Sequence, residues 1–245
     1  MTHNNKTPYC WLVTFGVMAL LLVWFAQRVT HVDRPQCTTK ARPESYPFKA
    51  GDVLLCPSSL VTRLFSNSIW GHVALVYRDP YNGMLYAWET RIPVQGTWNT
   101  ITTSLKSKAT RLTPLFRYLK RSPQPICVRS LLPREVDTHR LADFVRQKWN
   151  QPFGFDFVTN GANRVFMDVV GVPVITRTKG SARYCAELIA ETLHFLGVLD
   201  VNATVDPHVR TNTIIPRDFS EHEEHLPFAN GFSLGPEVLL SPVIS

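Results

Sequence analysis

The chain has 245 residues, of which 44% are hydrophobic and 18% are charged. This composition fits one medium-sized domain, with or without an appendage, and it excludes wholesale disorder and a long coiled coil. The 18 prolines and 12 glycines follow no repeat, which excludes collagen. The net charge of +7 is a modest excess. It suits a membrane-facing surface as well as nucleic-acid binding, and it does not distinguish between the two.

The N-terminal segment, residues 1–28, has the composition of a membrane anchor. Residues 7–27 carry no charged side chain, which predicts a transmembrane helix at about residues 8–27. A cleaved signal peptide is disfavoured, because no small residue stands three positions before a cut after Ala26. Lys and Arg are more frequent on the C-terminal side of this segment. We therefore expect a single-pass protein anchored in a lipid bilayer, with its large domain in the cytosol.

The next elements are expected in the following order. Residues 29–49 are polar and contain three prolines, which is typical of a stalk. Residues 53–56 form a short apolar strand. Residues 72–77 and 84–89 flank a turn at 79–83, and two such β-rich runs predict a hairpin.

The second half of the chain is expected to contain two clear helices. Residues 91–130 are interpreted as irregular, with a short helix at 112–119 and a strand at 126–129. One apolar stripe predicts a helix that opens at Pro133 and ends before Pro152. A second helix begins near Tyr184–Cys185, and Gly197 fits its C-terminal cap.

The cysteines outside the N-terminal segment show no metal-binding spacing. Cys37, Cys56, Cys127 and Cys185 are widely scattered, and no CxxC pair exists, which excludes a zinc ribbon. The scatter favours a reducing compartment with free thiols, although the sequence leaves the pairing of the first three open. No metal and no cofactor are expected.

Cys185 is the candidate nucleophile. It lies at the expected start of a helix, where unpaired N–H groups and the helix dipole favour a thiolate, and Arg183 adds a nearby positive charge. The alternative is an inert, packed thiol, which is the usual fate of a cysteine. His194 is half a helical turn out of phase with Cys185 and is excluded as its partner. His222 and His225 are interpreted as a solvated face.

His72 is the candidate base and Glu89 the candidate residue that orients it. If Asp79 to Asn82 form a four-residue loop, the pairing places His72 directly opposite Glu89. The carboxylate would then fix the imidazole tautomer and favour the imidazolium. A two-residue turn at Asn82–Gly83 would instead pair His72 with Pro93, and Glu89 would then not lie opposite His72. A structural histidine and a solvated glutamate remain the alternatives.

At these residues the sequence resembles the NlpC-like, circularly permuted papain-fold amidases of the YaeF/YiiX type. The resemblance covers about residues 50–220. It rests on short motifs in a shared order, which are Gly51–Leu55, Ser68–Val73, Trp88–Glu89, Gly154–Phe157, Tyr184–Leu188 and Thr213–Phe219. The long stretch at 91–130 and the N-terminal anchor depart from the family pattern.

The resemblance implies an α+β fold with a permuted papain-like (NlpC-type) core. An antiparallel sheet would pack on the Cys-bearing helix, preceded by one N-terminal transmembrane helix. The hydrolase domain would span residues 50–220, and residues 221–245 would form a loosely held tail. It also implies the catalytic residues Cys185, His72 and Glu89.

The expected function is that of a membrane-anchored cysteine hydrolase. It would cleave an amide bond, in a peptide or an acyl-amino substrate, through a thioester intermediate. Two alternatives stay open at this point. One is an acyltransferase or lipase on the same scaffold, which would act on lipid, and the other is an inactive, anchored binding domain. Nucleic acid is not an expected partner, because no aromatic and basic module is visible.

Overall fold

The computed structural model describes part of the chain. The described residues are Val23, 37, 39–57, 68–91, 109–122, 124–152, 184–200, 214–221, 226–229 and 231–241. Within them no helix is long and apolar enough to cross a membrane. The predicted transmembrane helix at about residues 8–27 is therefore not supported, and apart from Val23 that stretch lies outside the described residues.

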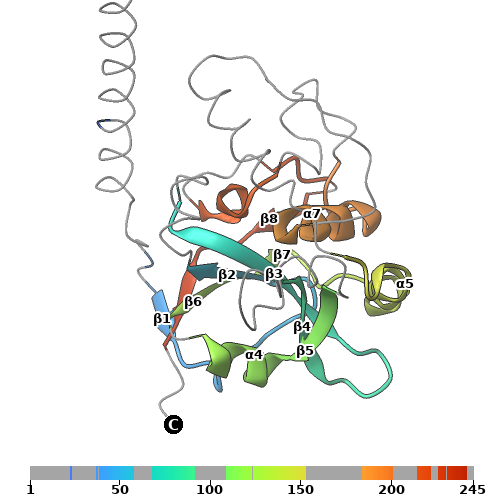
Figure 1. The fold of residues 1–245 in the computed structure, drawn as a ribbon, viewed down its shortest axis with the longest axis horizontal. Coiled ribbons are helices and arrows are strands. Elements are labelled where there is room, and N and C mark those ends of the chain that lie inside the picture. The colour runs from blue at the N-terminus through green and yellow to red at the C-terminus, as the bar shows by residue number, and fades with distance from the viewer. Residues whose placement is uncertain are drawn as a thin grey trace, which may run out of the picture.

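The described residues form a mixed α+β fold around a seven-stranded sheet of order β1-β9-β6-β2-β3-β4-β5 (Figure 1). The strands of this sheet are β1 (Thr39–Ala41), β2 (Val53–Pro57), β3 (Trp70–Arg78), β4 (Leu85–Thr90), β5 (Thr110–Pro114), β6 (Ile126–Arg129) and β9 (Val238–Leu240). A separate pair is formed by β7 (Leu131–Leu132) and β8 (Ser233–Leu234). The antiparallel sheet expected from the sequence needs one correction, because β1 pairs with β9 in parallel.

The two faces of the sheet are covered by different helices. On one face, α7 (Cys185–Phe195) and the 3₁₀ helix η2 (Pro216–Phe219) pack against β3, and on the other, α4 (Leu115–Arg121) packs against β4 and β5 (Figure 1). The alternation of side chains along β3 explains this division, since Val73 and Leu75 face the α7 side while Ala74 and Val76 face the α4 side. Both faces of the central strands are thus buried.

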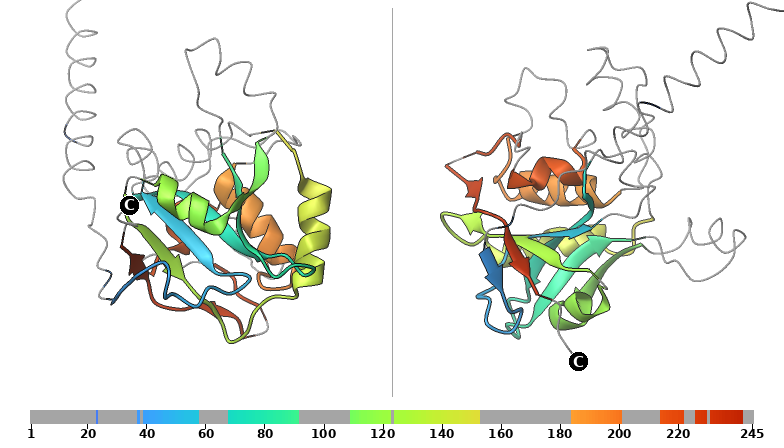
Figure 2. Two further views of the ribbon diagram at one scale, coloured as in Figure 1. Left: turned by 90° about the horizontal axis from the view of Figure 1, so that it is seen from below. Right: turned by 90° about the vertical axis from the view of Figure 1, so that its left-hand side faces the viewer.

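The helices expected after Pro133 and at Tyr184 are both present, with adjusted ends. The first, α5, runs from Thr138 to Lys148, because the Asp137 side chain accepts hydrogen bonds from the backbone N–H groups of residues 139 and 140 and caps it. The second, α7, begins at Cys185 as expected, and Gly197 follows its end with a positive φ of 72°. The two helices lie side by side (Figure 2), and the rings of Phe144 and Phe195 are 5.1 Å apart.

The predicted hairpin exists, but its register was predicted wrongly by two residues. Leu75 lies opposite Trp88, and Arg78 lies opposite Leu85, so six residues rather than four separate the paired ends. The side chains of Asp79 and Asn82 accept hydrogen bonds from backbone N–H groups two residues ahead and stabilise this longer loop. A shift of two residues keeps every side chain on its predicted face. His72 and Glu89 therefore stay on the same side of the sheet, although they are no longer directly opposed.

Four strands lie in stretches for which the sequence predicted another structure. Residues 110–114 form β5, whereas only a helix at 112–119 was expected in that region, and α4 occupies the second half of it. Strand β1 lies within the expected stalk, and β8 and β9 lie within the expected tail. The expected stalk and the expected tail each contribute a strand to the seven-stranded sheet, β1 and β9. The buried ring of Phe48 packs on the face that α4 covers. Strands of two or three residues carry too short a pattern for periodicity to reveal.

Candidate functional site

Cys185 is the first residue of α7, and its side chain is buried with 7% of its surface exposed. Its position leaves the Cys185 backbone N–H outside the helical hydrogen-bond ladder. Burial raises the pKa of the thiol, but the charge and hydrogen bond of His72 and the backbone N–H groups of Val73 and Ala186 outweigh it. The net result is a pKa below the ordinary value of 9.0, which favours the thiolate.

The His72 and Glu89 side chains form an ion pair. Nε2 of His72 lies 2.9 Å from Oε2 of Glu89. The Glu89 side chain is 1% exposed, while that of His72 is 21% exposed, so the carboxylate lies below the imidazole and away from solvent. The contact is a diagonal one between neighbouring strands, which a histidine can span.

The imidazole connects Cys185 to Glu89. Burial lowers the pKa of His72, but the Cys185 thiolate and the Glu89 carboxylate more than compensate and raise it to about 9. Since Nε2 is engaged with Glu89, Nδ1 is the nitrogen left to face Cys185. The sequence-predicted residues Cys185, His72 and Glu89 are thus brought together in one chain of contacts, with the imidazole in the middle.

Two further side chains, which the sequence analysis did not identify, hold Glu89 in place. Nε of Arg111 donates to Oε1 of Glu89 at 3.1 Å, and the hydroxyl of Thr113 donates to the same oxygen at 3.4 Å. Burial raises the pKa of Glu89, but hydrogen bonding and charge from His72, followed by Arg111, lower it overall. Both partners lie on β5, the strand that the sequence did not predict, and recognising its alternation of residues would have placed them beside β4.

The other two histidines that the structure describes, His194 and His139, have partners away from Cys185. Nδ1 of His194 donates to the backbone carbonyl of Leu199 at 2.9 Å, so this side chain connects the last turn of α7 to the segment that follows it. The ring of His139 lies edge-on to Tyr81, 6.1 Å away. His222 and His225 lie outside the described residues.

Trp70, Tyr184 and Phe155 are near the predicted site residues in sequence, where aromatic side chains either line a cleft or belong to the core, and the two that the structure describes are core residues. Trp70 is 2% exposed at the start of β3. Tyr184 is 1% exposed, and its hydroxyl donates a short hydrogen bond to the Ile214 carbonyl. Phe155 lies outside the described residues. Trp70 and Tyr184 therefore position β3 and the start of α7, and they do not line the site.

The arrangement provides the elements of nucleophilic chemistry in one place. The pKa of the Cys185 thiol is lowered and that of the His72 imidazole is raised, and both shifts favour a thiolate beside an imidazolium. The Glu89 carboxylate fixes the imidazole through Nε2. Such a pair can attack a carbonyl carbon and then deliver a proton to a leaving group.

Comparisons with known proteins leave the family open. No family model matches the chain, and no curated protein matches it. Among solved structures, the crystal structure of the metalloprotein YiiX from Escherichia coli O157:H7, labelled DUF1105, aligns with a TM-score of 0.44 and 13% sequence identity. The alignment covers 82% of this chain and 100% of that one. This neighbour is of the YaeF/YiiX type, while membership of the NlpC-like amidases is not confirmed.

Proposed function

We propose that the chain is a cysteine hydrolase that cleaves an amide bond, in a peptide or an acyl-amino substrate. Cys185 is the nucleophile, His72 is the acid and base, and Glu89 orients His72. The observation that carries the proposal is the continuous contact from a thiol of lowered pKa, through an imidazole of raised pKa, to a buried carboxylate. Groups whose pKa values are pushed in the directions that catalysis requires are characteristic of active sites.

The proposed reaction proceeds in two steps. The Cys185 thiolate attacks the carbonyl carbon, and the backbone N–H of Cys185, which lies in the first turn of α7 outside the helical hydrogen-bond ladder, donates to the oxyanion. The intermediate collapses as the His72 imidazolium gives its proton to the departing amine, which leaves a thioester. Water then attacks the thioester while His72 accepts its proton, and the acid product leaves as the Cys185 thiolate forms again.

A thiol-reactive electrophile such as iodoacetamide tests the pair, with labelling of each cysteine followed by mass spectrometry across pH. Labelling of Cys185 is expected to persist to lower pH than that of an ordinary thiol, since the pKa of its thiol is lowered by His72. As pH falls further the thiolate is protonated and labelling declines. In His72→Ala the pKa should rise, so the labelling curve should shift to higher pH.

The other described thiols are internal controls in that experiment. Burial raises the pKa of Cys56 to about 12 and that of Cys37 to about 11, so both should react slowly at neutral pH. The proposal fails if Cys185 labels no faster than Cys56, or if His72→Ala leaves its labelling curve in place. The chain would then be better described as a binding domain.

Glu89→Gln removes the carboxylate charge while keeping a side chain of similar shape. The imidazolium of His72 loses a stabilising partner, so the pKa of His72 should fall from about 9 and that of Cys185 should rise. The pH of half-maximal Cys185 labelling is therefore expected to increase in this variant. Asp143→Asn is the matched control, because Asp143 is an exposed carboxylate that pairs with Arg146 on α5. An unchanged curve in Glu89→Gln would show that Glu89 does not act on the pair.

A further inference from the structure

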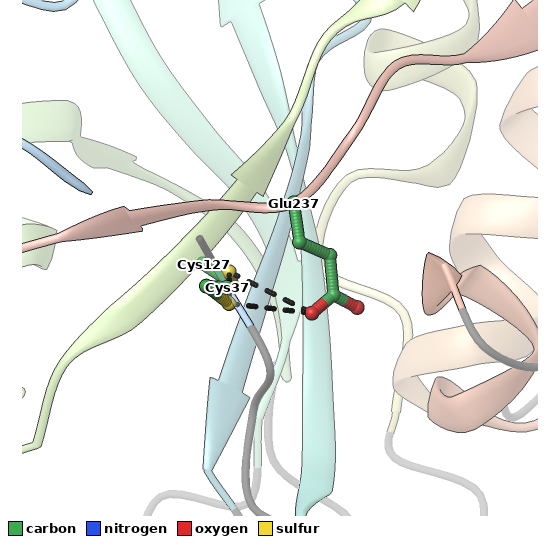
Figure 3. Close-up of side chains that lie close together, drawn as sticks. All are labelled: Cys37, Cys127 and Glu237. Atoms are coloured by element: carbon green, nitrogen blue, oxygen red, sulfur yellow. Dashed lines mark hydrogen bonds between the residues drawn. The ribbon is translucent and has the colours of Figure 1, made fainter. Parts of the chain in front are cut away.

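A second cluster of reactive side chains lies on the opposite half of the sheet, away from β4 and β5. Cys37 lies two residues before β1, Cys127 lies on β6, and Glu237 directly precedes β9. These three strands are neighbours in the order β1-β9-β6. Figure 3 shows the carboxylate of Glu237 turned toward the sulfur atoms of both cysteines. The described fold thus brings together three donors that are 90 to 200 residues apart in sequence.

The two distances from the carboxylate oxygen to the sulfur atoms are close to those of a tetrahedral metal site, while the sulfur atoms lie closer together than in such a site. The sulfur atoms of Cys37 and Cys127 are 2.9 Å apart, and Oε2 of Glu237 lies 3.4 Å from the first and 4.0 Å from the second. With a Zn–S bond of about 2.3 Å and a Zn–O bond of about 2.1 Å, tetrahedral angles place S···S at about 3.8 Å and S···O at about 3.6 Å. The carboxylate is therefore already in place, and only the sulfur atoms must separate. Cys37 is half-buried and precedes an edge strand, so fewer contacts oppose a shift of its sulfur than of the buried Cys127 sulfur.

The environment of Glu237 points to a cation. The residue is 3% exposed, and within the described residues it forms no ion pair with Lys, Arg or His. Its Oε1 accepts the backbone N–H of Glu221 at 3.0 Å, whereas Oε2 faces the two thiols. A buried carboxylate is costly unless a positive charge or good hydrogen bonds compensate it, and thiols are weak donors. A divalent ion between the two sulfur atoms and Oε2 would supply the missing charge.

We propose that Cys37, Cys127 and Glu237 bind a thiophilic divalent cation, of which Zn²⁺ is the best match to two sulfurs and one carboxylate oxygen. The fourth ligand is water, which enters beside half-buried Cys37. On binding, each thiol releases its proton to solvent and no group is oxidised. The ion would connect the segment before β1 to β6 and β9. This inference is independent of the proposed hydrolase function.

The alternative for this cluster is a disulfide between Cys37 and Cys127. It would need an oxidant, and its neutral sulfurs would leave Oε2 of Glu237 without a positive partner. The position of the carboxylate therefore favours the metal, and the disulfide becomes an outcome of the test.

The test uses the full chain carrying Cys185→Ser, so that the proposed active site cannot contribute a thiolate ligand. After reduction with a phosphine and removal of metal by a chelator, Zn²⁺ is titrated calorimetrically and Co²⁺ is titrated by absorbance. We expect about one equivalent of ion per chain, a sulfur-to-cobalt charge-transfer band, and an increase in Tm when Zn²⁺ is added.

Three additional substitutions locate the site. Cys37→Ser and Glu237→Gln should each weaken Zn²⁺ binding by more than about tenfold, since loss of even an outer-shell partner costs about 10–100-fold. Glu237→Gln retains an oxygen that can accept from the Glu221 N–H, which keeps the local fold. Cys56→Ser should bind as before, because Cys56 hydrogen-bonds to Tyr118 on the α4 face instead.

Two results would overturn the proposal. One is reduced, folded protein that takes up no Zn²⁺, or that binds it equally well after Cys37→Ser and Glu237→Gln. The other is mass spectrometry of freshly isolated, unreduced protein that recovers Cys37 and Cys127 as a cross-linked peptide, which would assign the pair to a disulfide.

Discussion

Cys185→Ser is expected to lower hydrolysis of peptide and acyl-amino substrates by at least about 10³-fold, because the nucleophile is lost while the rest of the site stays in place. A hydroxyl has a far higher pKa than a thiol, so His72 cannot hold it as the anion. Serine is nearly isosteric, and the side chain is only 7% exposed, so the fold should tolerate the change. The measurement is the rate of acid product release from a panel of such substrates, with the unfolding transition recorded in parallel.

Asp143→Asn is the control for that experiment, since Asp143 is an exposed carboxylate on α5 that pairs with Arg146. It should retain the activity of the parent chain. The nature of the product discriminates further, because transfer to another acceptor would yield a new ester or amide instead of the free acid. A Cys185→Ser chain that hydrolyses the substrates at the parent rate would refute the proposed mechanism.

Arg129→Met is expected to reduce the free energy of unfolding by about 3–5 kcal/mol. Arg129 is 1% exposed on β6, and its guanidinium donates to the carbonyls of Gly235 at 2.7 Å, Phe219 at 2.9 Å and Leu234 at 3.0 Å. Methionine fills a similar space but leaves these buried acceptors without their donor. Chemical denaturation of the two proteins measures the difference.

Arg146→Met serves as the comparison, because Arg146 is exposed and its only described ion pair is with Asp143. Surface pairs of this kind are worth about 0–1 kcal/mol. If Arg129→Met does not accumulate as folded protein, Arg129→Lys should fold with an intermediate stability, since lysine keeps the charge but has fewer donors. Equal stability of Arg129→Met and the parent chain would contradict the role of Arg129 in joining β6 to the segment before β9.

The elements that the sequence predicted well are those with a long pattern or strong end signals. The helix at Cys185 was recognised from its apolar spacing and Gly197, and the hairpin from the turn residues between two β-rich runs. The same turn residues did not determine the number of loop residues, and for this reason the register was wrong by two. The juxtaposition of His72 and Glu89 survived because the side-chain period of a strand is two.

The parts that the sequence did not reveal depend on contacts distant along the chain. Arg111 lies in a stretch that the sequence analysis interpreted as irregular, because β5 is too short to show a clear pattern. Its function follows only from the pairing of β5 with β4, which places Arg111 opposite Glu89. The cluster of Cys37, Cys127 and Glu237 has no local spacing at all, and only the order of the strands assembles it. Interactions of this kind follow from topology, which the local periodicity of a sequence does not encode.

The position of β9 beside the edge strand β1 has a consequence for how the chain folds. This strand, residues 238–240, is the last described strand to be synthesised, yet it lies between β6 and the first strand, β1. Strand β1 can therefore join the sheet only after residues 238–240 have left the ribosome. Contacts so distant in sequence form slowly, because the entropy cost of closing a long loop comes before the contacts can stabilise the fold. Until then the edge of β6 remains unpaired, and a nascent chain would depend on the cell to protect that edge from aggregation.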